Sequence, residues 1–307
     1  MCKKAIYLLS SFLLIIFVAG CGEKEKPSKI SIRRKITNAA KNEMADHLLF
    51  GVSASESPQG IYRKYNSMVS YLEHKTERQV KLVQRRTYSE LNELFKEKKV
   101  DFAWFAAGAY VSISKDLNTD ILALPSKGGK PNYYSYIIVR SDSPVSKFDE
   151  LSGKPFAFVD PLSCSGYYYP AYVLSEKGLG SNRFFSRTVF SGGHDRSVGL
   201  VLNKEVDGAS VSSIILHKMQ ENSHDVERFA KVIQASDSLT MGPIVAQKGM
   251  SVDLKERLKE ILLNMHLQED GKAALRNIGI DGFIPGSDLD YTATRKMVKI
   301  AEGIPTR

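Results

Sequence analysis

Three absences narrow the class of protein before any motif is considered. Only three cysteines occur in 307 residues, which excludes a small fold held by a framework of disulfides. The N-terminal apolar segment, residues 5–18, has 14 residues, fewer than the ~20 that a transmembrane helix needs. The six histidines show neither an H-E-x-x-H motif nor a paired-cysteine spacing, so no metal site and no cofactor are predicted.

The rest of the composition is that of an ordinary globular protein. Hydrophobic residues make up 43% and charged residues 25%, which excludes a disordered chain, a fibrous repeat and a polytopic membrane protein. Lysine and arginine outnumber aspartate and glutamate by 43 to 34, which gives a net charge of +9. This excess makes nucleic acid, anionic membrane surfaces and small anions the candidate partners.

The N-terminus has the features of an export signal. Lys3 and Lys4 precede the apolar segment, which ends in Val18-Ala19-Gly20-Cys21. This ending resembles a bacterial lipobox, in which the peptide is cleaved before the cysteine and the cysteine receives lipid. We therefore predict a lipoprotein signal peptide at residues 1–20 and a lipidated Cys21, which places the protein on the extracytoplasmic side of a bacterial membrane. The alternative is an ordinary signal peptide with an incidental cysteine. Export removes nucleic acid from the candidate partners.

The segment after the signal is predicted to be a lipidated cysteine and tether, residues 21–46. Residues 22–29 are polar and charged and contain one proline, which is typical of a linker that holds a folded body away from the membrane. Because Cys2 leaves with the signal and Cys21 carries lipid, Cys164 is the one free thiol of the mature chain. A mature monomer then has no internal disulfide.

From residue 47 onward, short apolar runs alternate with segments of helical periodicity. Strands are predicted at residues 48–52, 80–83, 100–105, 121–124, 134–139, 156–159, 206–211, 231–234 and 244–246. Helices are predicted at residues 61–76, 88–95, 167–177 and 252–267. This alternation predicts an α/β fold with mainly parallel sheets.

The enzyme motifs in the sequence are incomplete. The Ser163-Cys164-Ser165-Gly166 segment lacks the first glycine of a nucleophile elbow, because residue 162 is a leucine. His194 and Asp195 are adjacent, so they project differently and do not form a base with its orienting group. The segment at residues 128–130 lacks both the spacing and the ending of a P-loop. A protein without catalytic activity is predicted, and a hydrolase that uses Ser165 or Cys164 with His194 is the alternative.

Two predicted helix starts are suited to binding an anion. Residues 160–166 follow a strand and place serines at a helix N-terminus, where backbone N–H groups point outward. Residues 191–195 precede another apolar-periodic segment, and there the glycines allow close approach of the backbone while His194 can donate to an oxyanion. For the first start, the alternative is that Ser163 or Ser165 only caps the helix. For the second, the alternative is a surface turn in which His194 binds no ligand. Together the two starts predict a shared pocket for a small anion.

Seven segments, taken in order, resemble one protein family. They are Phe50-Gly51-Val52-Ser53, Val100-Asp101-Phe102-Ala103-Trp104-Phe105, residues 138–143, residues 156–161, Ser165-Gly166-Tyr167, Ser191-Gly192-Gly193-His194-Asp195 and Val206-Asp207-Gly208-Ala209. In this order they resemble the substrate-binding proteins of phosphate, phosphite and phosphonate ABC importers, from about residue 48 to residue 292.

The resemblance implies a two-lobed type II periplasmic-binding-protein fold that closes over its ligand by a hinge between the lobes. Lobe 1 is expected at residues 47–133 plus 241–307 and lobe 2 at residues 134–240. An ABC permease and ATPase complex is the implied partner, and the binding protein itself is expected to be a monomer. A ligand-sensing subunit of the same fold, which signals to a membrane kinase, is the alternative from a different functional class.

The resemblance also implies the ligand-binding residues. Hydroxyl and N–H groups at one helix start hold the oxyanion, a histidine reaches the same oxygens, and two tyrosines line or bond the ligand; for the tyrosines, core or hinge packing is the alternative. These residues are Ser163, Cys164, Ser165, Gly166, His194, Tyr88 and Tyr133. Cys164 stands where the family usually has threonine, so a weak thiol replaces one hydroxyl donor while backbone donation survives.

One departure from the family pattern bears on the ligand. Members that take aminoalkyl phosphonates place two carboxylates against the ammonium group, and the matching positions are Ile214 and Gly242. An ammonium group there is desolvated without a partner, which is costly. The sequence therefore predicts phosphite, phosphate or methylphosphonate as the ligand in preference to aminoethylphosphonate.

Overall fold

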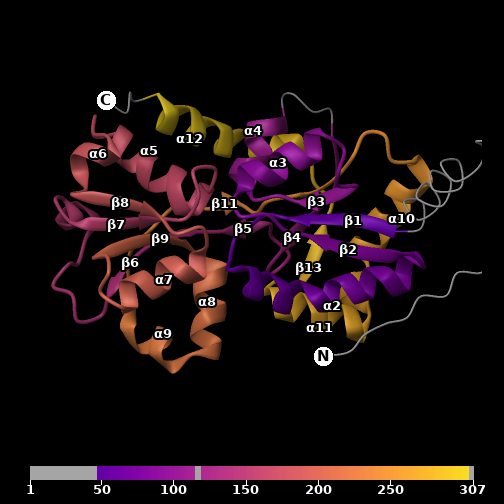
Figure 1. Ribbon diagram of the computed structural model, residues 1–307, viewed down its shortest axis with the longest axis horizontal. Helices are drawn as coiled ribbons and strands as arrows, with labels where there is room; N and C mark the ends of the chain where they lie inside the picture. The colour runs from indigo at the N-terminus through magenta and orange to yellow at the C-terminus, as the bar shows by residue number, and fades with distance from the viewer. Residues whose placement is uncertain (1–46, 115–118, 304–307) are drawn as a thin grey trace, which may run out of the picture. The chain divides into compact units, whose positions relative to one another are not determined.

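The computed structural model describes residues 47–114 and 119–303. The predicted signal peptide, the predicted lipid site at Cys21 and the predicted tether lie outside the described residues. Across the two described ranges, no helix is long and apolar enough to cross a bilayer. Two separate sheets with flanking helices form the two lobes, which confirms the predicted α/β class (Figure 1).

The first sheet has six strands in the order β13-β4-β12-β3-β1-β2. Its strands are β1 (His47–Val52), β2 (Gln79–Val83), β3 (Phe102–Trp104), β4 (Asp120–Ser126), β12 (Ile244–Ala246) and β13 (Gly282–Ile284). Strand β1 lies inside the sheet, and its Phe50 is fully buried and stacks on Phe102 of β3 with ring centroids 4.7 Å apart. Burial of this kind explains why the strand reads as a nearly continuous apolar run in the sequence.

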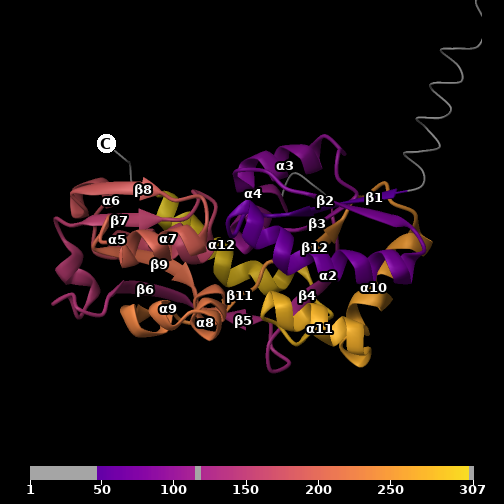
Figure 2. The same cartoon turned by 60° about the horizontal axis from the view of Figure 1, so that its bottom comes forward.

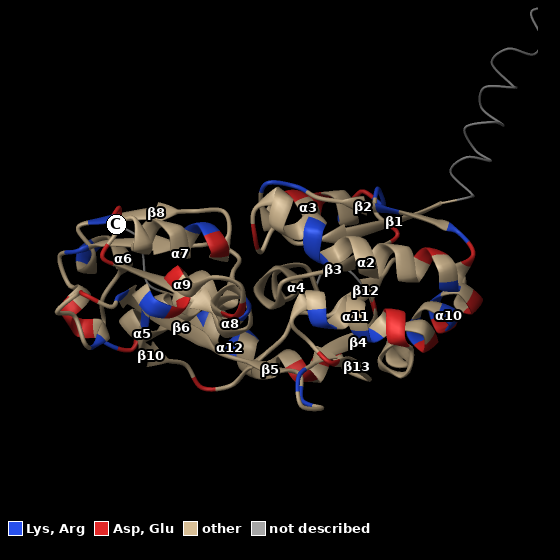
Figure 3. Cartoon of the chain, turned by 90° about the horizontal axis from the view of Figure 1, so that it is seen from below, with Lys and Arg blue, Asp and Glu red and all other residues tan. Residues whose placement is uncertain are grey.

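Helices cover both faces of the first sheet (Figure 1). They are α2 (Pro58–Thr76), α3 (Tyr88–Lys96), α4 (Ala107–Ser114), α10 (Val252–Leu263) and α11 (Glu269–Ile278). Ile61 of α2 and Leu275 of α11 pack with Phe50 in one apolar core, while Leu91 of α3 belongs to the core on the other side. Helix α4 carries no charged residue, as expected for a helix that is buried along most of its length (Figure 3).

The second sheet has five strands in the order β10-β6-β9-β7-β8. Its strands are β6 (Ser135–Arg140), β7 (Pro155–Phe158), β8 (Arg187–Phe190), β9 (Gly208–Ser212) and β10 (Ala230–Ala235). Its helical segments are η1 (Phe148–Leu151), the π-helical turn η2 (Cys164–Tyr168), α5 (Tyr169–Ser175), α6 (Ser181–Phe184), α7 (His194–Leu202), α8 (Ser213–Asn222) and α9 (His224–Phe229). Stacked rings of Phe156 and Phe185, with centroids 4.3 Å apart, form part of the core beneath this sheet.

Both sheets are mixed, so the prediction of mainly parallel sheets is wrong. Strand β1 is parallel to β2 and β3, and β7 is parallel to β8 and β9, but β12 is antiparallel to β3 and β4, and β6 is antiparallel to β9 and β10. Strands β6 and β12 each follow a crossing of the chain from the other sheet, after β5 (Asn132–Tyr133) and β11 (Leu239–Thr240) respectively. A strand that arrives from another sheet is not joined to its neighbours by a helical crossover, so nothing requires it to run parallel to them.

The connections between the lobes lie close together (Figure 2). Strands β5 and β11 pair with each other, with Leu239 opposite Tyr133. After η3 (Met265–Leu267) and β13, the chain continues through η4 (Asp288–Tyr291) into helix α12 (Thr292–Glu302), which packs against both α4 and α5. The Tyr168 hydroxyl donates to Glu302 at 3.1 Å, so α12 links the two lobes in addition to the β5–β11 pair.

Candidate ligand-binding site

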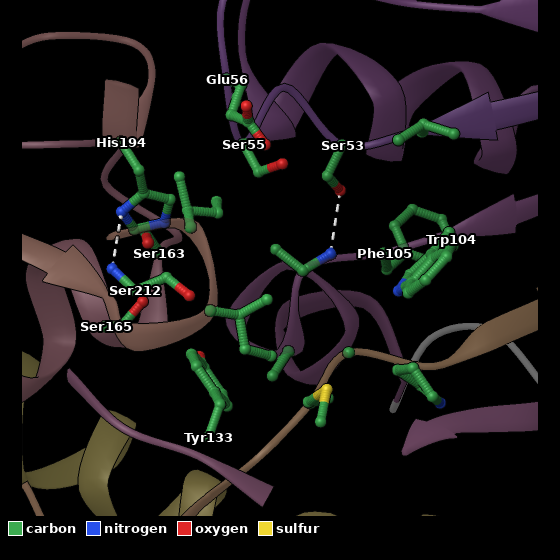
Figure 4. Close-up of a pocket in the computed structure, with 18 of the residues that line it drawn as sticks. Ser53, Ser55, Glu56, Trp104, Phe105, Tyr133, Ser163, Ser165, His194 and Ser212 are labelled. Carbon is green, nitrogen blue, oxygen red and sulfur yellow. Dashed lines mark hydrogen bonds between the residues drawn. The ribbon is translucent and has the colours of Figure 1, made fainter. Parts of the chain in front are cut away.

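A cavity of about 120 Å³ lies where strands of the two sheets end (Figure 4). Ser53 and Ser55 follow β1, Phe105 follows β3, and Ser212 ends β9, and all four line the cavity. Crevices outside the carboxyl ends of strands are the usual ligand sites of open α/β sheets. The fold therefore places polar side chains from both lobes at a position suited to a small ligand.

Six of the seven predicted ligand-binding residues line this cavity. They are Tyr88, Tyr133, Ser163, Cys164, Ser165 and His194. Gly166 is absent from the lining among the described residues; its N–H donates to Ser163 Oγ at 3.0 Å, and a Cβ there would lie 2.5 Å from the Val159 side chain. Close packing against Val159 therefore explains the glycine.

The π-helical turn η2 is held in place from beneath. Ser163 caps it by accepting the Gly166 N–H, so the capping alternative applies to this hydroxyl. The hydroxyl oxygens of Ser135 and Ser210 each lie 2.6 Å from the carbonyl oxygen of Ser165. The N–H of Cys164, at the first position of the turn, contacts no acceptor among the described residues. A fixed turn with an unused backbone donor is suited to binding an anion.

His194 lies at the first turn of α7 and is 3% exposed. The backbone N–H of Ser212 donates to its Nδ1 at 3.0 Å, so Nδ1 is the acceptor and the ring proton is on Nε2. Burial lowers the pKa of His194 from 6.5 to about 3, so the ring is neutral at pH 7. Its second ring nitrogen lies on the cavity side (Figure 4). His194 is therefore a neutral N–H donor and has no free lone pair for use as a general base.

The two tyrosines lie close to the serines at the start of the η2 turn. Tyr88 interacts with the hydroxyl of Ser163, and Tyr133 interacts with the hydroxyl and the backbone N–H of Ser165. Burial raises the pKa of both phenols well above the ordinary value, so both keep their protons at neutral pH. Tyr133 is on β5, one of the strands that connect the lobes, and Tyr88 begins α3. The cavity thus has phenol groups on the lobe 1 side and in the hinge.

The Cys164 thiol is a poor nucleophile in this environment. The residue is 3% exposed and packs in an apolar core. Burial raises its pKa from 9.0 to about 12, so the thiolate is not formed at neutral pH. Across the described ranges, no group of three or more His, Cys, Asp or Glu side chains is arranged to hold a metal ion.

Sequence reasoning missed a buried ion pair in the lining. Glu56 is 7% exposed and accepts from Lys64 Nζ at 2.5 Å. Burial raises the pKa of Glu56, and the Lys64 charge opposes that rise. Nothing in the local sequence joins the two residues to the η2 turn, because the β1–α2 connection reaches the cavity only through tertiary folding. Ser53 and Ser55 carry the signal that singled out Ser163, namely serines directly after a predicted strand.

The wall opposite His194 is largely apolar. Trp104 lies across the cavity from His194, Ser163 and Ser212 (Figure 4). The other apolar side chains of the lining include Tyr65, Pro125, Ile214, Met241, Ile278 and Ile280. Gly242 also lines the cavity, and a Cβ at this position would overlap the carbonyl oxygen of Phe105. The backbone therefore leaves no room for a side chain at 242, and Ile214 presents no charge.

Two aspartates join the lobes across the cleft. The Asp195 carboxylate accepts the backbone N–H of Ser57 at 3.0 Å, at the N-terminus of α2. The Asp160 carboxylate accepts the N–H of Tyr88 at 3.1 Å, at the N-terminus of α3. The His194 N–H donates to the carbonyl of Ser55 at 2.8 Å. The lobes are therefore in direct contact next to the cavity, whose lining includes Ser55, Tyr88 and His194.

Comparison with known proteins gives matches to a family model and to curated proteins. The sequence model of a family described as "ABC transporter, phosphonate, periplasmic substrate-binding protein" matches residues 50–291. The phosphonates-binding periplasmic protein of Escherichia coli (strain K12) is 28% identical over 280 residues, which cover 90% of this chain and 82% of that protein. The phosphate-import protein PhnD of Mycolicibacterium smegmatis is 26% identical over 266 residues, which cover 80% of this chain and 83% of that protein.

Solved structures show the same fold. A binding protein component of an ABC phosphonate transporter from Pseudomonas aeruginosa superposes with a TM-score of 0.78 at 23% identity, covering 83% of this chain and 86% of that one. PhnD1 from Prochlorococcus marinus, solved in complex with methylphosphonate, superposes with a TM-score of 0.77 at 19% identity, covering 84% of this chain and 99% of that one.

Proposed function

Because this chain belongs to the family of phosphonate-binding periplasmic substrate-binding proteins of ABC transporters, we propose that its cavity captures a small phosphorus oxyanion for import. The family is one of binding proteins and not of enzymes. The hydrolase alternative is therefore set aside, in agreement with the protonated thiol of Cys164 and the occupied Nδ1 of His194.

The observation that supports the ligand class best is the neutral N–H donor of His194 beside the serine turn. A phosphonate, phosphite or phosphate group presents several oxygens that accept hydrogen bonds. Two neutral donors are fixed by the fold, His194 Nε2 and the Cys164 backbone N–H. Each can donate a hydrogen bond to an oxygen of such a group. Ser163, Ser165 and Ser212 add hydroxyl groups around the same space.

The lining also supports a ligand without an ammonium group. Among the described residues, Glu56 is the one carboxylate of the lining, and it is already paired with Lys64, so an amine would have to displace that lysine. At Gly242 the backbone leaves no room for a carboxylate, and Ile214 offers no charge. An ammonium group in the apolar half of the cavity would be desolvated without a partner.

We further propose that lipid on Cys21 holds the mature protein at the outer side of the membrane, where it delivers ligand to a permease and ATPase complex as a monomer. The lobe boundaries at residues 133/134 and 240/241 are part of this proposal. A gene deletion distinguishes a component of an importer from a ligand-sensing subunit. Deleting the gene should abolish growth on the bound compound as sole phosphorus source if the protein serves an importer, whereas loss of a sensor changes expression without abolishing uptake.

The ligand class is tested by a thermal-shift panel on the chain from Gly22 onward. Phosphate, phosphite, methylphosphonate and aminoethylphosphonate are compared. At a hundredfold excess over the dissociation constant, binding adds ~2.7 kcal/mol of stability, which raises the melting temperature by roughly 5 °C for a chain of this size. A shift with at least one of the first three compounds and none with the amine is expected. No shift with any of the four contradicts the proposal, and the largest shift with aminoethylphosphonate contradicts its specificity.

A further inference from the structure

The cavity has two chemically different ends. His194, Ser163, Ser165 and Ser212 gather at one end, whereas Trp104 lies at the other (Figure 4). The charged side chains of the lining are Glu56 and Lys64, and they form an ion pair with each other. Figure 4 places Glu56 beside Ser55, on the His194 side. The Trp104 end therefore offers apolar surface and no charge to a ligand.

Packing holds the apolar end in a fixed shape. Trp104 is 8% exposed, and its ring makes edge contacts with Tyr65 and Phe283, with centroids 5.5 and 5.4 Å away. Ile278 and Ile280 come from the end of α11 and belong to the same apolar core. Gly279 between them has a φ of 91°, a backbone conformation that glycine adopts readily, and this turn brings the segment close to Ile214 of lobe 2.

The cavity is larger than an oxyanion head group needs. One water-sized group itself occupies ~10–15 Å³. A cavity of about 120 Å³ therefore holds several groups beyond the phosphorus and three oxygens of a phosphonate head. If those atoms bind at the serine and histidine end, the fourth substituent on phosphorus points along the remaining space towards Trp104.

We propose that the preferred ligand is a phosphonate whose organic substituent is apolar and larger than methyl, with that substituent packed between Trp104, Ile214 and Ile280. This inference rests on the proposed function, because it assumes that the phosphonate head binds at the His194 end. It adds that Ile214 and Trp104 determine which substituent is accepted. Apolar surface buried on both partners is what makes such a substituent favourable.

Calorimetric titration of a homologous series tests the proposal. Phosphate, methyl-, ethyl-, propyl- and phenylphosphonate are titrated into the chain from Gly22 onward. Affinity should rise about fourfold for each methylene from methyl to propyl, the fold-change that corresponds to ~0.8 kcal/mol per buried CH₂. Binding of phosphate or methylphosphonate with no gain, or with a loss, for the longer members overturns this inference and leaves the proposed function standing. Binding of no member overturns both.

A pair of variants tests the wall itself. Ile214 is only partly buried, so Ile214→Asp adds a charge to the cavity lining without burying that charge in the apolar core. The variant should lower the ratio of propylphosphonate affinity to phosphate affinity at least tenfold, and it should gain affinity for aminoethylphosphonate. Leu289→Asp, at a side chain that is 80% exposed and outside the cavity lining, is the matched control and should keep the wild-type ratio. An unchanged ratio in Ile214→Asp overturns the assignment of Ile214.

Discussion

The imidazole of His194 shows how one buried side chain joins the binding chemistry to the stability of the fold. The Ser212 N–H fixes the tautomer, and burial keeps the ring neutral. A charged ring would attract any anion, whereas a neutral ring binds through the geometry of one N–H donor. Selectivity at this end of the cavity is therefore expected to come from the positions of donors and to depend little on net charge.

His194 should make the folded protein less stable in acid. Its pKa is lowered to about 3, whereas the unfolded chain takes up this proton below ~6.5. As pH falls through that interval, the unfolded state binds more protons than the folded state, so the free energy of unfolding falls. The expected loss from this residue between pH 8 and pH 5 is about 2 kcal/mol. Urea unfolding of the wild type and of His194→Gln at both pH values measures it. Equal losses in the two proteins would show that His194 is not the cause.

Gly242 should tolerate no side chain. A Cβ there would overlap the Phe105 carbonyl oxygen, so Gly242→Ala must move one of the two backbone segments that line the cavity. Forcing atoms into a packed site typically costs ~1–3 kcal/mol, and ligand affinity should fall as well. Gly249→Ala is the control, because nothing lies within 4 Å of a Cβ at that position. The account predicts a clear difference in melting temperature between the two variants, and matching values would refute the overlap.

Some site residues were accessible from sequence and others were not. Ser163, Ser165 and His194 lie in segments with a recognisable order of glycine, serine and histidine, and all three line the cavity. Trp104 belongs to one of the segments that carried the resemblance, yet its place in the wall depends on how Tyr65 and Phe283 pack around it. Glu56 and Lys64 lie in no recognisable sequence motif, and their ion pair is evident only from the fold.

Helix α2 begins at a contact with the opposite lobe. The N–H of Ser57, its N-cap residue, donates to both oxygens of Asp195, at 3.0 and 3.1 Å. A carboxylate at a helix N-terminus also interacts favourably with the helix dipole. The contact exists only while the two lobes touch, so it stabilises the closed arrangement and not either lobe alone.

Asp195→Ala should therefore weaken ligand binding through lobe closure. A hydrogen bond to a charged group contributes ~1.5–3 kcal/mol. If all of this free energy supports closure, the affinity falls by roughly 10- to 150-fold. Asp225→Ala, in the exposed first turn of α9, is the matched control. Calorimetric affinities of both variants decide the matter, and an Asp195→Ala protein that binds like the control would remove the contact from the closing mechanism.

Each strand and helix predicted from sequence has a counterpart in the structure, but strands β8 and β13 and helices α4, α8, α11 and α12 were missed, and strand direction was not predicted correctly. The predicted strand at residues 48–52 and the predicted helix at residues 61–76 coincide with β1 and α2, because apolar spacing reports which side of an element is buried. The same spacing is indifferent to strand polarity. Strands β6 and β12 run against their neighbours because each enters its sheet from the other lobe. Their direction is a consequence of topology.

The proposed membrane attachment depends on Cys21, which lies outside the described residues. If Cys21 carries lipid, Cys21→Ala should move the protein from the membrane fraction to the soluble extracytoplasmic fraction. Cys164→Ala is the control and should stay with the membrane. Fractionation of cells that express each variant, followed by mass spectrometry of the N-terminal peptide, gives the answer. A Cys21→Ala protein that still sediments with membranes contradicts the lipid anchor.

The central claim is that a phosphorus oxyanion binds at the His194 end of the cavity. Its most direct test is a calorimetric titration of methylphosphonate into the wild type, His194→Ala and His224→Ala, the last at a fully exposed histidine on α9. We predict one site per chain in the wild type, an affinity roughly 10- to 150-fold weaker in His194→Ala, and wild-type affinity in His224→Ala. Equal binding by the wild type and His194→Ala would place the ligand elsewhere and contradict the account.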